Sequence, residues 1–188
     1  HTLVAGVDWD EWDYDSTTPF GHPLATQRNR AIYFQDSVAL SSATVASVGA
    51  RLHRTEFGAA DLVSGAGASS ERAPRAFEIA ARHRYREPFA VYGKIGTSFR
   101  VPTVNEIYDL FTATVAMLEP QTSHDRELGV ELDLGRASYR LAAYEMDINN
   151  EIHFNPITFS NVNLPPTRRY GFELEGKWQL SVNLNAFA

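Results

Sequence analysis

Residues 124–134 have the sequence His-Asp-Arg-Glu-Leu-Gly-Val-Glu-Leu-Asp-Leu. Apolar Leu128 and Val130 alternate there with acidic Glu127 and Glu131. A period of two places the apolar side chains on one face of an extended strand and the charged ones on the other. A helix would need apolar residues at every third or fourth place. This stretch therefore predicts a β-strand with one apolar and one charged face.

The same alternation recurs along the chain, most clearly over residues 168–180. It predicts an all-β, antiparallel fold of about ten strands. Within residues 137–147 the alternation is lost between Ala143 and Met146, which predicts a bulge. The expected strands are 1–13, 27–40, 43–56, 75–87, 89–98, 123–134, 137–147, 151–159, 167–179 and 182–188.

The connections between these strands alternate between tight and long. Tight turns are expected near residues 41–42, 87–88, 135–136 and 180–181, and long excursions over 14–26, 57–74, 99–122 and 148–166. This alternation gathers all the long loops at one end of the sheet. Outer-membrane barrels have short periplasmic turns and long external loops, with roughly 9–11 tilted residues per crossing. The fold class predicted is therefore a segment of an antiparallel transmembrane β-barrel.

Composition excludes several classes of function. The 188 residues carry 17 basic and 23 acidic side chains, a formal net charge of -6, so no nucleic-acid partner is expected. The absence of cysteine excludes disulfides, iron–sulfur clusters and thiol catalysis. The six histidines form no H-E-x-x-H pair, so no metal site and no catalytic residue is predicted. The first residues lack a basic signal-peptide region, and we expect the chain to be a piece of a longer protein.

Five blocks in order resemble the C-terminal half of the barrel of TonB-dependent outer-membrane receptors. They are Ser98–Tyr108, Leu118–Ser123, Glu127–Gly129, Asp147–Ile152 and Arg169–Glu175. Earlier segments, Gly6–Asp8, Tyr33–Asp36 and Val48–Arg51, are also similar to strands of that family, so the resemblance covers nearly the whole chain. The motif residues expected to be structural are Phe99, Arg100, Pro102, Glu106, Tyr108, Glu127, Gly129, Gly171 and Glu173.

Elementary chemistry supports a structural role for these blocks. Pro102 removes a backbone donor, so the strand containing Phe99 must stop before it. Residues 103–109 can then form one helical turn with Glu106 near its start. Mid-strand Gly129 and Gly171 permit the close approach of another chain segment. Four acids are expected to share the polar face with basic partners, namely Glu127, Glu131, Glu173 and Glu175 with Arg51, Arg82, Lys94 and Arg140.

The resemblance implies a plugged barrel of ~22 strands in the bacterial outer membrane. Residues 1–188 would form part of that barrel domain, with the plug domain, its coupling box and the remaining strands lying outside them. The implied function is the binding and active import of a metal chelate, above all a ferric siderophore. The implied partners are the chelate, outer-membrane lipid and the energy-coupling protein TonB, which acts through the plug. No cofactor is expected, because the iron chelate is the cargo.

Aromatic and basic side chains in the long loops suit planar, anionic iron chelates. The candidate ligand-binding residues are Trp12, Tyr14, His22, Phe111, His153 and Phe154, with Phe20 and Phe159 as further loop aromatics. Haem receptors of the family have a histidine after the Phe-Arg-x-Pro block. Residues 103–117 contain none, which lowers haem among the expected ligands.

Two other classes of protein stay open on the sequence. An outer-membrane hydrolase could use His22 with the carboxylates of Asp8, Asp10, Asp13 or Asp15. A soluble β-sandwich would bury Leu128, Val130, Leu132 and Leu134 against a second sheet, whereas a barrel would expose them to lipid.

Overall fold

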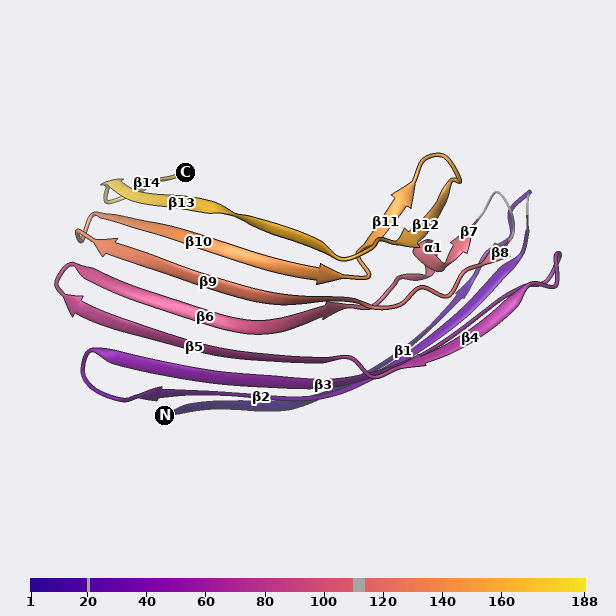
Figure 1. The fold of residues 1–188 in the computed structure, drawn as a ribbon, viewed down its shortest axis with the longest axis horizontal. Helices are drawn as coiled ribbons and strands as arrows, with labels where there is room; N and C mark the ends of the chain where they lie inside the picture. Colours follow the sequence, from indigo (N-terminus) through magenta and orange to yellow (C-terminus); the bar gives the residue numbers. More distant parts are fainter. Residues whose placement is uncertain (20, 110–113) are drawn as a thin grey trace.

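The computed structural model describes residues 1–19, 21–109 and 114–188, and these form one long curved antiparallel sheet (Figure 1). The neighbours in the sheet follow the order β1-β2-β3-β5-β6-β9-β10-β13-β14, with β4 paired to the far part of β3. The strands of this sheet are β1 (Thr2–Asp15), β2 (Pro23–Ala39), β3 (Thr44–Asp61), β4 (Gly67–Arg72), β5 (Arg75–Arg86), β6 (Phe89–Arg100), β9 (Gln121–Asp133), β10 (Ala137–Asn149), β13 (Thr167–Ser181) and β14 (Leu184–Phe187).

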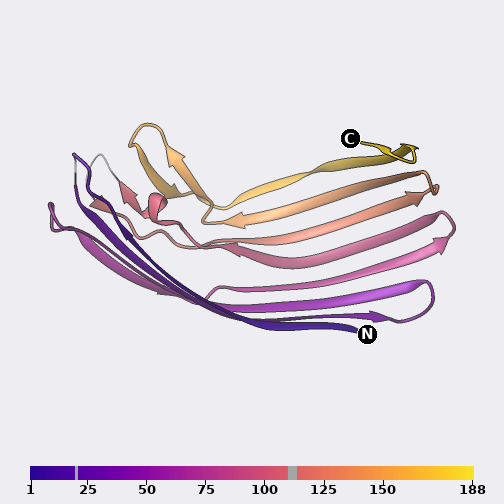
Figure 2. The same ribbon diagram turned by 180° about the vertical axis from the view of Figure 1, so that it is seen from behind.

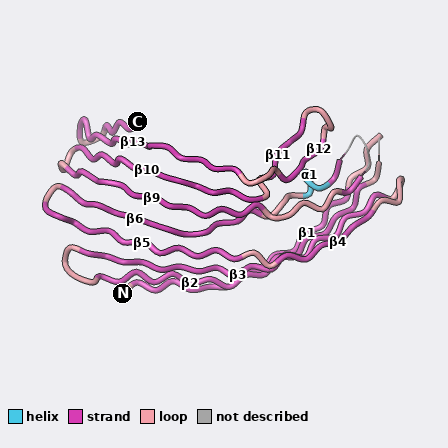
Figure 3. The backbone as a smooth tube through the Cα atoms, in the orientation of Figure 1, coloured by secondary structure: helices cyan, strands magenta, loops and turns pink. Residues whose placement is uncertain are grey.

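Small elements gather at one end of the sheet. They are helix α1 (Val104–Ile107) with the strand pair β7 (Tyr108–Asp109) and β8 (Thr114–Val115), and the hairpin of β11 (Ile152–Asn155) and β12 (Ser160–Asn163). The tight turns and both ends of the chain lie at the opposite end (Figures 1 and 2). Strand dominates the backbone, with one short helical turn in the described part (Figure 3). The predicted separation of short turns from long excursions is confirmed.

The two faces of the sheet differ in chemistry. One face presents large apolar side chains without cover, with Leu128 67% and Phe172 79% exposed. No second sheet packs on them in the described part of the chain, so the sandwich interpretation, which buries Leu128 and Val130, is wrong. Residues opposite each other in register share a face. We call this apolar face the outward face, since lipid can cover it without cost, as in outer-membrane barrels.

The inward face carries charges that pair across strands. Glu127 lies opposite Lys94 and accepts from it at 2.9 Å, and Arg140 reaches the same carboxylate at 2.6 Å. Arg82 bonds to Glu131 at 2.7 Å. The expected partnership of inward acids with basic residues is confirmed for these two glutamates. Arg51 pairs instead with Asp8 at 2.7 Å, and Glu173 and Glu175 have no ion-pair partner among the residues that the structure describes.

The predicted bulge in residues 137–147 is wrong. β10 pairs with β9 and with β13 in uninterrupted register. The apolar alternation is lost because Glu145 and Asp147, which continue the outward series of Leu141 and Ala143, already lie beyond the apolar band. A charged outward side chain there marks the end of the lipid-facing zone and leaves the strand regular.

Strands extend further into the long connections than expected. β3 continues to Asp61, and the unpredicted β4 returns along it inside the 57–74 excursion. The strand expected at 151–159 is the separate hairpin β11–β12, which lies off the main sheet. Beyond the apolar band the outward face meets water, so apolar alternation ceases to report strand there. In the described ranges, no helix has the length and apolarity that a bilayer-spanning helix requires.

Gly129 shows why the inward face needs a residue without a side chain at this place. It lies directly opposite Tyr92, whose ring covers it and whose hydroxyl donates to Glu127 at 2.6 Å. A Cβ atom on Gly129 would overlap the Tyr92 ring. Gly171 is covered in the same way by Tyr144. The expected close approach at both glycines is confirmed.

We therefore expect Gly129→Ala to lower the stability of the barrel by about 1–3 kcal/mol, because the new methyl group displaces the Tyr92 ring from its bond to Glu127. Gly93→Ala is the matched control, since its Cβ meets its nearest neighbour at an ordinary 3.6 Å. Urea unfolding of the complete protein in detergent measures both effects. Equal stability of the two variants would contradict the assignment.

Candidate functional site

An apolar cluster lies where the strands leave the membrane zone. Phe57, Ala25 and Ala59 from β2 and β3 pack with Ile107 of α1. Partly buried side chains surround them, namely Trp12, Tyr14, Val104, Val115 and Met117. Burial of this cluster holds the excursion after β6 against the ends of β1–β3. The loop end is therefore a packed assembly with its own small core.

A buried carboxylate that accepts several hydrogen bonds also fixes the excursion after β6. Asp61, only 1% exposed at the end of β3, accepts from the Tyr108 hydroxyl at 2.7 Å. Its other oxygen accepts from the backbone N–H groups of Val63 at 3.0 Å and Ser64 at 2.6 Å. The Ser64 and Tyr108 hydrogen bonds are the main reason that the pKa of Asp61 falls from 3.8 to about 2. Gly21 admits this contact, because a Cβ there would lie 2.5 Å from the carboxylate.

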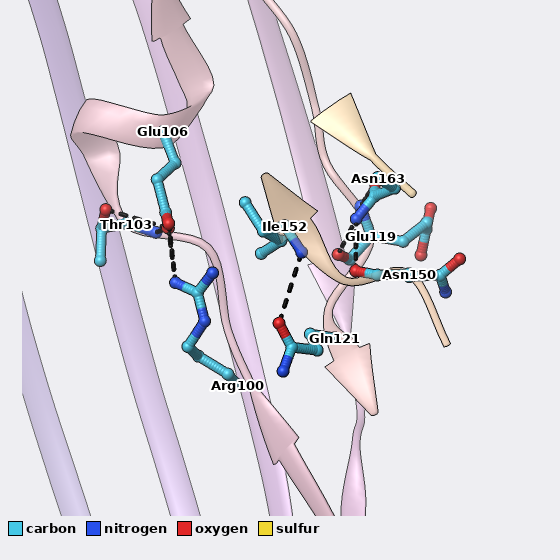
Figure 4. Close-up of polar contacts among 8 residues, drawn as sticks. All are labelled: Arg100, Thr103, Glu106, Glu119, Gln121, Asn150, Ile152 and Asn163. Carbon is cyan, nitrogen blue, oxygen red and sulfur yellow. Dashed lines mark hydrogen bonds and ion pairs between the residues drawn. The ribbon is translucent and has the colours of Figure 1, made fainter. Parts of the chain in front are cut away.

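The turn after β6 is held by an ion pair (Figure 4). Arg100 Nη1 lies 2.7 and 2.9 Å from the two carboxylate oxygens of Glu106. That carboxylate also accepts from the backbone N–H of Thr103 at 2.8 Å and from its hydroxyl at 3.1 Å. Burial alone would raise the pKa of Glu106, and the bonds from Thr103 and Arg100 outweigh it and lower that pKa. Helix α1 therefore begins with a capping-box arrangement between Thr103 and Glu106, and the predicted helical turn with Glu106 near its start is confirmed.

A second set of bonds joins this excursion to the β11–β12 hairpin (Figure 4). The side-chain oxygen of Asn163 accepts from the Glu119 N–H at 2.8 Å. Its amide group donates to the carbonyl oxygens of Glu119 at 3.0 Å and Asn150 at 2.8 Å. Gln121 accepts from the Ile152 N–H at 3.3 Å. Arg72 at the end of β4 forms an ion pair with the Glu119 carboxylate.

Three predicted ligand residues lie within or beside the packed assembly. Trp12 and Tyr14 point inward and are partly buried against the apolar cluster, with the Trp12 and Phe57 rings edge to face at 6.3 Å. His22 bonds through its Nε2 to Asp15 at 2.8 Å. These side chains therefore support the packed loop end, and their contact with a ligand stays a prediction.

The other two described candidates are more accessible. His153 and Phe154 are exposed on β11, and the Phe154 ring lies 6.4 Å from that of Phe159 across the hairpin. Phe111 and Phe20 lie outside the described residues. The structure therefore leaves the β11–β12 hairpin as the exposed aromatic element among the predicted ligand residues that it describes.

Sequence reasoning missed three residues that organise the loop end, Asp61, Arg72 and Asn163. Asp61 follows a run of small residues and carries the turn-forming sequence Leu-Val-Ser-Gly after it, which was a usable signal for a carboxylate that accepts backbone N–H groups. Glu119, which bonds to both Arg72 and Asn163, is 47 and 44 residues away from them in sequence, so no local pattern could have revealed these contacts.

An open sheet with a lipid-compatible outer face, a charged inner face and a packed loop end is typical of a segment of an outer-membrane β-barrel. The family model for the TonB-dependent receptor-like β-barrel matches residues 1–188. The chain belongs to the TonB-dependent receptor family, which consists of transporters of the Gram-negative outer membrane and not of enzymes. The hydrolase interpretation of the Asp15–His22 pair is therefore wrong.

Solved structures agree on the fold. The copper transporter OprC superposes with a TM-score of 0.75 at 15% identity, over 98% of this chain and 33% of that chain. The alcaligin outer-membrane receptor FauA from Bordetella pertussis gives 0.68 at 14%, over 97% and 34% of the two chains. The ferric yersiniabactin uptake receptor FyuA from Yersinia pestis gives 0.66 at 15%, over 96% and 29%. The chain spans about a third of the length of these neighbours.

The Arg100–Glu106 pair is expected to serve assembly and not ligand choice. Arg100→Ala or Glu106→Ala should each lower stability by about 1–2 kcal/mol, and the double variant should be no worse than the worse single one, because both remove the same partly buried pair. The folded fraction on heat-modified gels measures this. Arg84→Ala is the control, since its exposed pair with Glu87 contributes little. Normal assembly with altered ligand selectivity would overturn the assignment.

The Asp61 centre predicts a defined response to acid. Because its pKa is about 2 in the folded state, the carboxylate stabilises the turn fully above its ordinary pKa of 3.8 and loses this effect as pH falls toward 2. Amide exchange at Val63 and Ser64, corrected for intrinsic rates, should lose protection in that window. Asp61→Asn should have lower protection at pH 7 and no such step. A step in the variant would show that another group is responsible.

Proposed function

We propose that the complete protein binds and imports a metal chelate, specifically a ferric siderophore, with energy supplied by TonB through the plug. Family membership across all 188 residues carries this proposal. The similar solved structures support a metal cargo, since they include a copper transporter, an alcaligin receptor and a ferric yersiniabactin uptake receptor. In this role the barrel performs no bond-making step.

The long connections at the loop end differ in how firmly they are held, and this difference suggests different roles. The excursion after β6 is fixed by the apolar cluster, by Asp61 and by the Arg100–Glu106 pair. The β11–β12 hairpin projects from the same end (Figure 1) and keeps Phe154 49% exposed. Aromatic faces and an imidazole suit a planar, anionic chelate through stacking and charge. The hairpin is therefore the proposed contact with cargo, and the fixed excursion is its support.

The test is growth of a siderophore-deficient strain that carries the complete receptor as its only iron importer. One ferric catecholate and one ferric hydroxamate are offered in turn as the sole iron source. Growth on one of them is expected, and a His153→Ala/Phe154→Ala variant should weaken its binding about tenfold because the stacking and charged contacts are lost. Phe172→Ala is the control, since this exposed aromatic faces outward.

Two outcomes would contradict the proposal. Growth on neither chelate, with uptake of copper(II) instead, would move the cargo away from siderophores. Equal binding by the hairpin variant and the Phe172→Ala control would remove the hairpin from the contact. Each assay includes the heat-modified gel, so that a loss of assembly is measured separately.

A further inference from the structure

The β11–β12 hairpin carries almost no charge of its own. Residues 152–163 include no aspartate, glutamate, lysine or arginine, although 21% of the whole chain is charged. His153 is their one titratable side chain. Glu151, which precedes β11, forms an ion pair with Arg169 of β13 and so belongs to the base of the hairpin. The surface that the hairpin offers to a ligand is therefore mainly apolar.

Large apolar side chains gather near the turn of this hairpin. Ile157 is 86% exposed and Phe159 is 56% exposed. The rings of Phe159 and the equally exposed Phe154 meet edge to face, with their centroids 6.4 Å apart. We call Phe154, Ile157 and Phe159 the apolar tip. A group of large apolar side chains that is left in water on a loop marks a binding surface.

The turn holds the apolar tip in a defined shape. The side-chain oxygen of Asn155 accepts from the N–H groups of Ile157 at 2.9 Å and Thr158 at 3.4 Å. The hydroxyl groups of Thr158 and Ser160 lie 2.8 Å apart. Phe159 has a φ of 56°, in the left-handed region that bulky residues rarely adopt. The chain therefore adopts an unfavourable backbone conformation at the residue whose ring completes the tip.

The base of the hairpin lies on the inward side of the barrel wall. Strand β12 contacts helix α1, and α1 packs through Ile107 on the apolar cluster of the loop end. Asn163 joins the same strand to Glu119 of the excursion after β6 (Figure 4). The hairpin is therefore placed at the mouth of the barrel, where cargo enters, and not on the lipid side.

The chemistry of the apolar tip differs from that of an iron-binding group. Ile157 has no aromatic face and no polar side-chain atom, so it gives a polar chelate neither stacking nor hydrogen bonds. A hydrocarbon chain is its natural complement, because contact removes apolar area of both partners from water. The absence of charge on residues 152–163 means that a chain covering the tip desolvates no ion.

We propose that the cargo is a ferric chelate with an acyl chain, and that this chain lies on the apolar tip of Phe154, Ile157 and Phe159. The inference rests on the proposed function, since it adds a second contact to the binding of a ferric siderophore. The iron-binding head meets the aromatic and imidazole groups of the hairpin, and the tail meets the tip. Ile157 then distinguishes acylated from unacylated chelates that have the same head.

The test uses the complete receptor in lipid nanodiscs with two synthetic ferric chelates, a trihydroxamate and a tris-catecholate, each with one free amine. The amine carries either an acetyl or a hexanoyl group, and quenching of tryptophan fluorescence measures binding. For the head that the receptor binds, the hexanoyl form should bind about tenfold more tightly or better. Burial of two methylene groups already gives a gain of roughly this size.

Variants at exposed aliphatic positions locate the tail. Ile157→Ser should reduce the gain from the hexanoyl group to less than about threefold and leave the affinity for the acetyl form unchanged. Ile157→Leu should keep the gain. Val63→Ser is the matched control, because Val63 is a 74% exposed aliphatic residue at a different turn of the loop end, and it should also keep the gain. Partition of the chelate into nanodisc lipid is the same for every variant.

The failures of the two proposals are distinguishable. Binding of neither head in either form would contradict the proposed function, and this inference with it. Equal affinity for the acetyl and hexanoyl forms of a bound head would overturn the acyl chain alone. A gain that survives Ile157→Ser, or that Val63→Ser removes equally, would place the tail elsewhere. Lower stability of Ile157→Ser in urea unfolding would show that Ile157 packs against another loop, which also overturns the proposal.

Discussion

Every backbone N–H and C=O group that enters a bilayer must find its partner in a neighbouring strand, because hydrocarbon offers none. The long ladders from β1 to β13 meet this requirement by continuous antiparallel pairing. The chemistry of the two faces of the sheet follows from this pairing. Side chains that alternate along a paired strand must be apolar toward lipid, and the other half can carry the charges that join neighbouring strands on the inner face. The loop end is free of the constraint, so it can form a helix turn, small hairpins and a core of its own.

Much of this architecture was predictable from local sequence. The alternation around Leu128 and Val130 identified the strand and its two faces, because the side-chain period is a direct consequence of backbone geometry. The barrel class depended in addition on the long connections that gather at one end of the sheet. Pro102 predicted the end of β6 and the short helix after it for an equally local reason. Gly129 predicted the close approach of another chain segment, although only the structure identified the neighbouring residue as Tyr92.

The features that were not predicted from the sequence depended mainly on contacts between residues far apart in the chain. Nothing near Asp61 or Tyr108 indicated that they meet, and the bond between them joins two different excursions. The bulge predicted in residues 137–147 was wrong for another reason, since Glu145 and Asp147 are outward residues above the lipid and break the apolar pattern without breaking the strand. The ligand candidates stay predictions, because an aromatic loop residue such as Trp12 can serve a core as well as a binding surface.

The three hydrogen bonds of the Asn163 side chain couple parts of the receptor that are far apart in the chain. One amide side chain holds the backbone of Glu119 in one excursion and the carbonyl of Asn150 at the base of another, while Arg72 ties Glu119 to β4. These bonds therefore connect three segments that are far apart in the polypeptide at a single place. Because these bonds connect the hairpin with the excursion after β6 and with β4, a displacement of the hairpin would be transmitted to both of them, and the three segments are expected to move together.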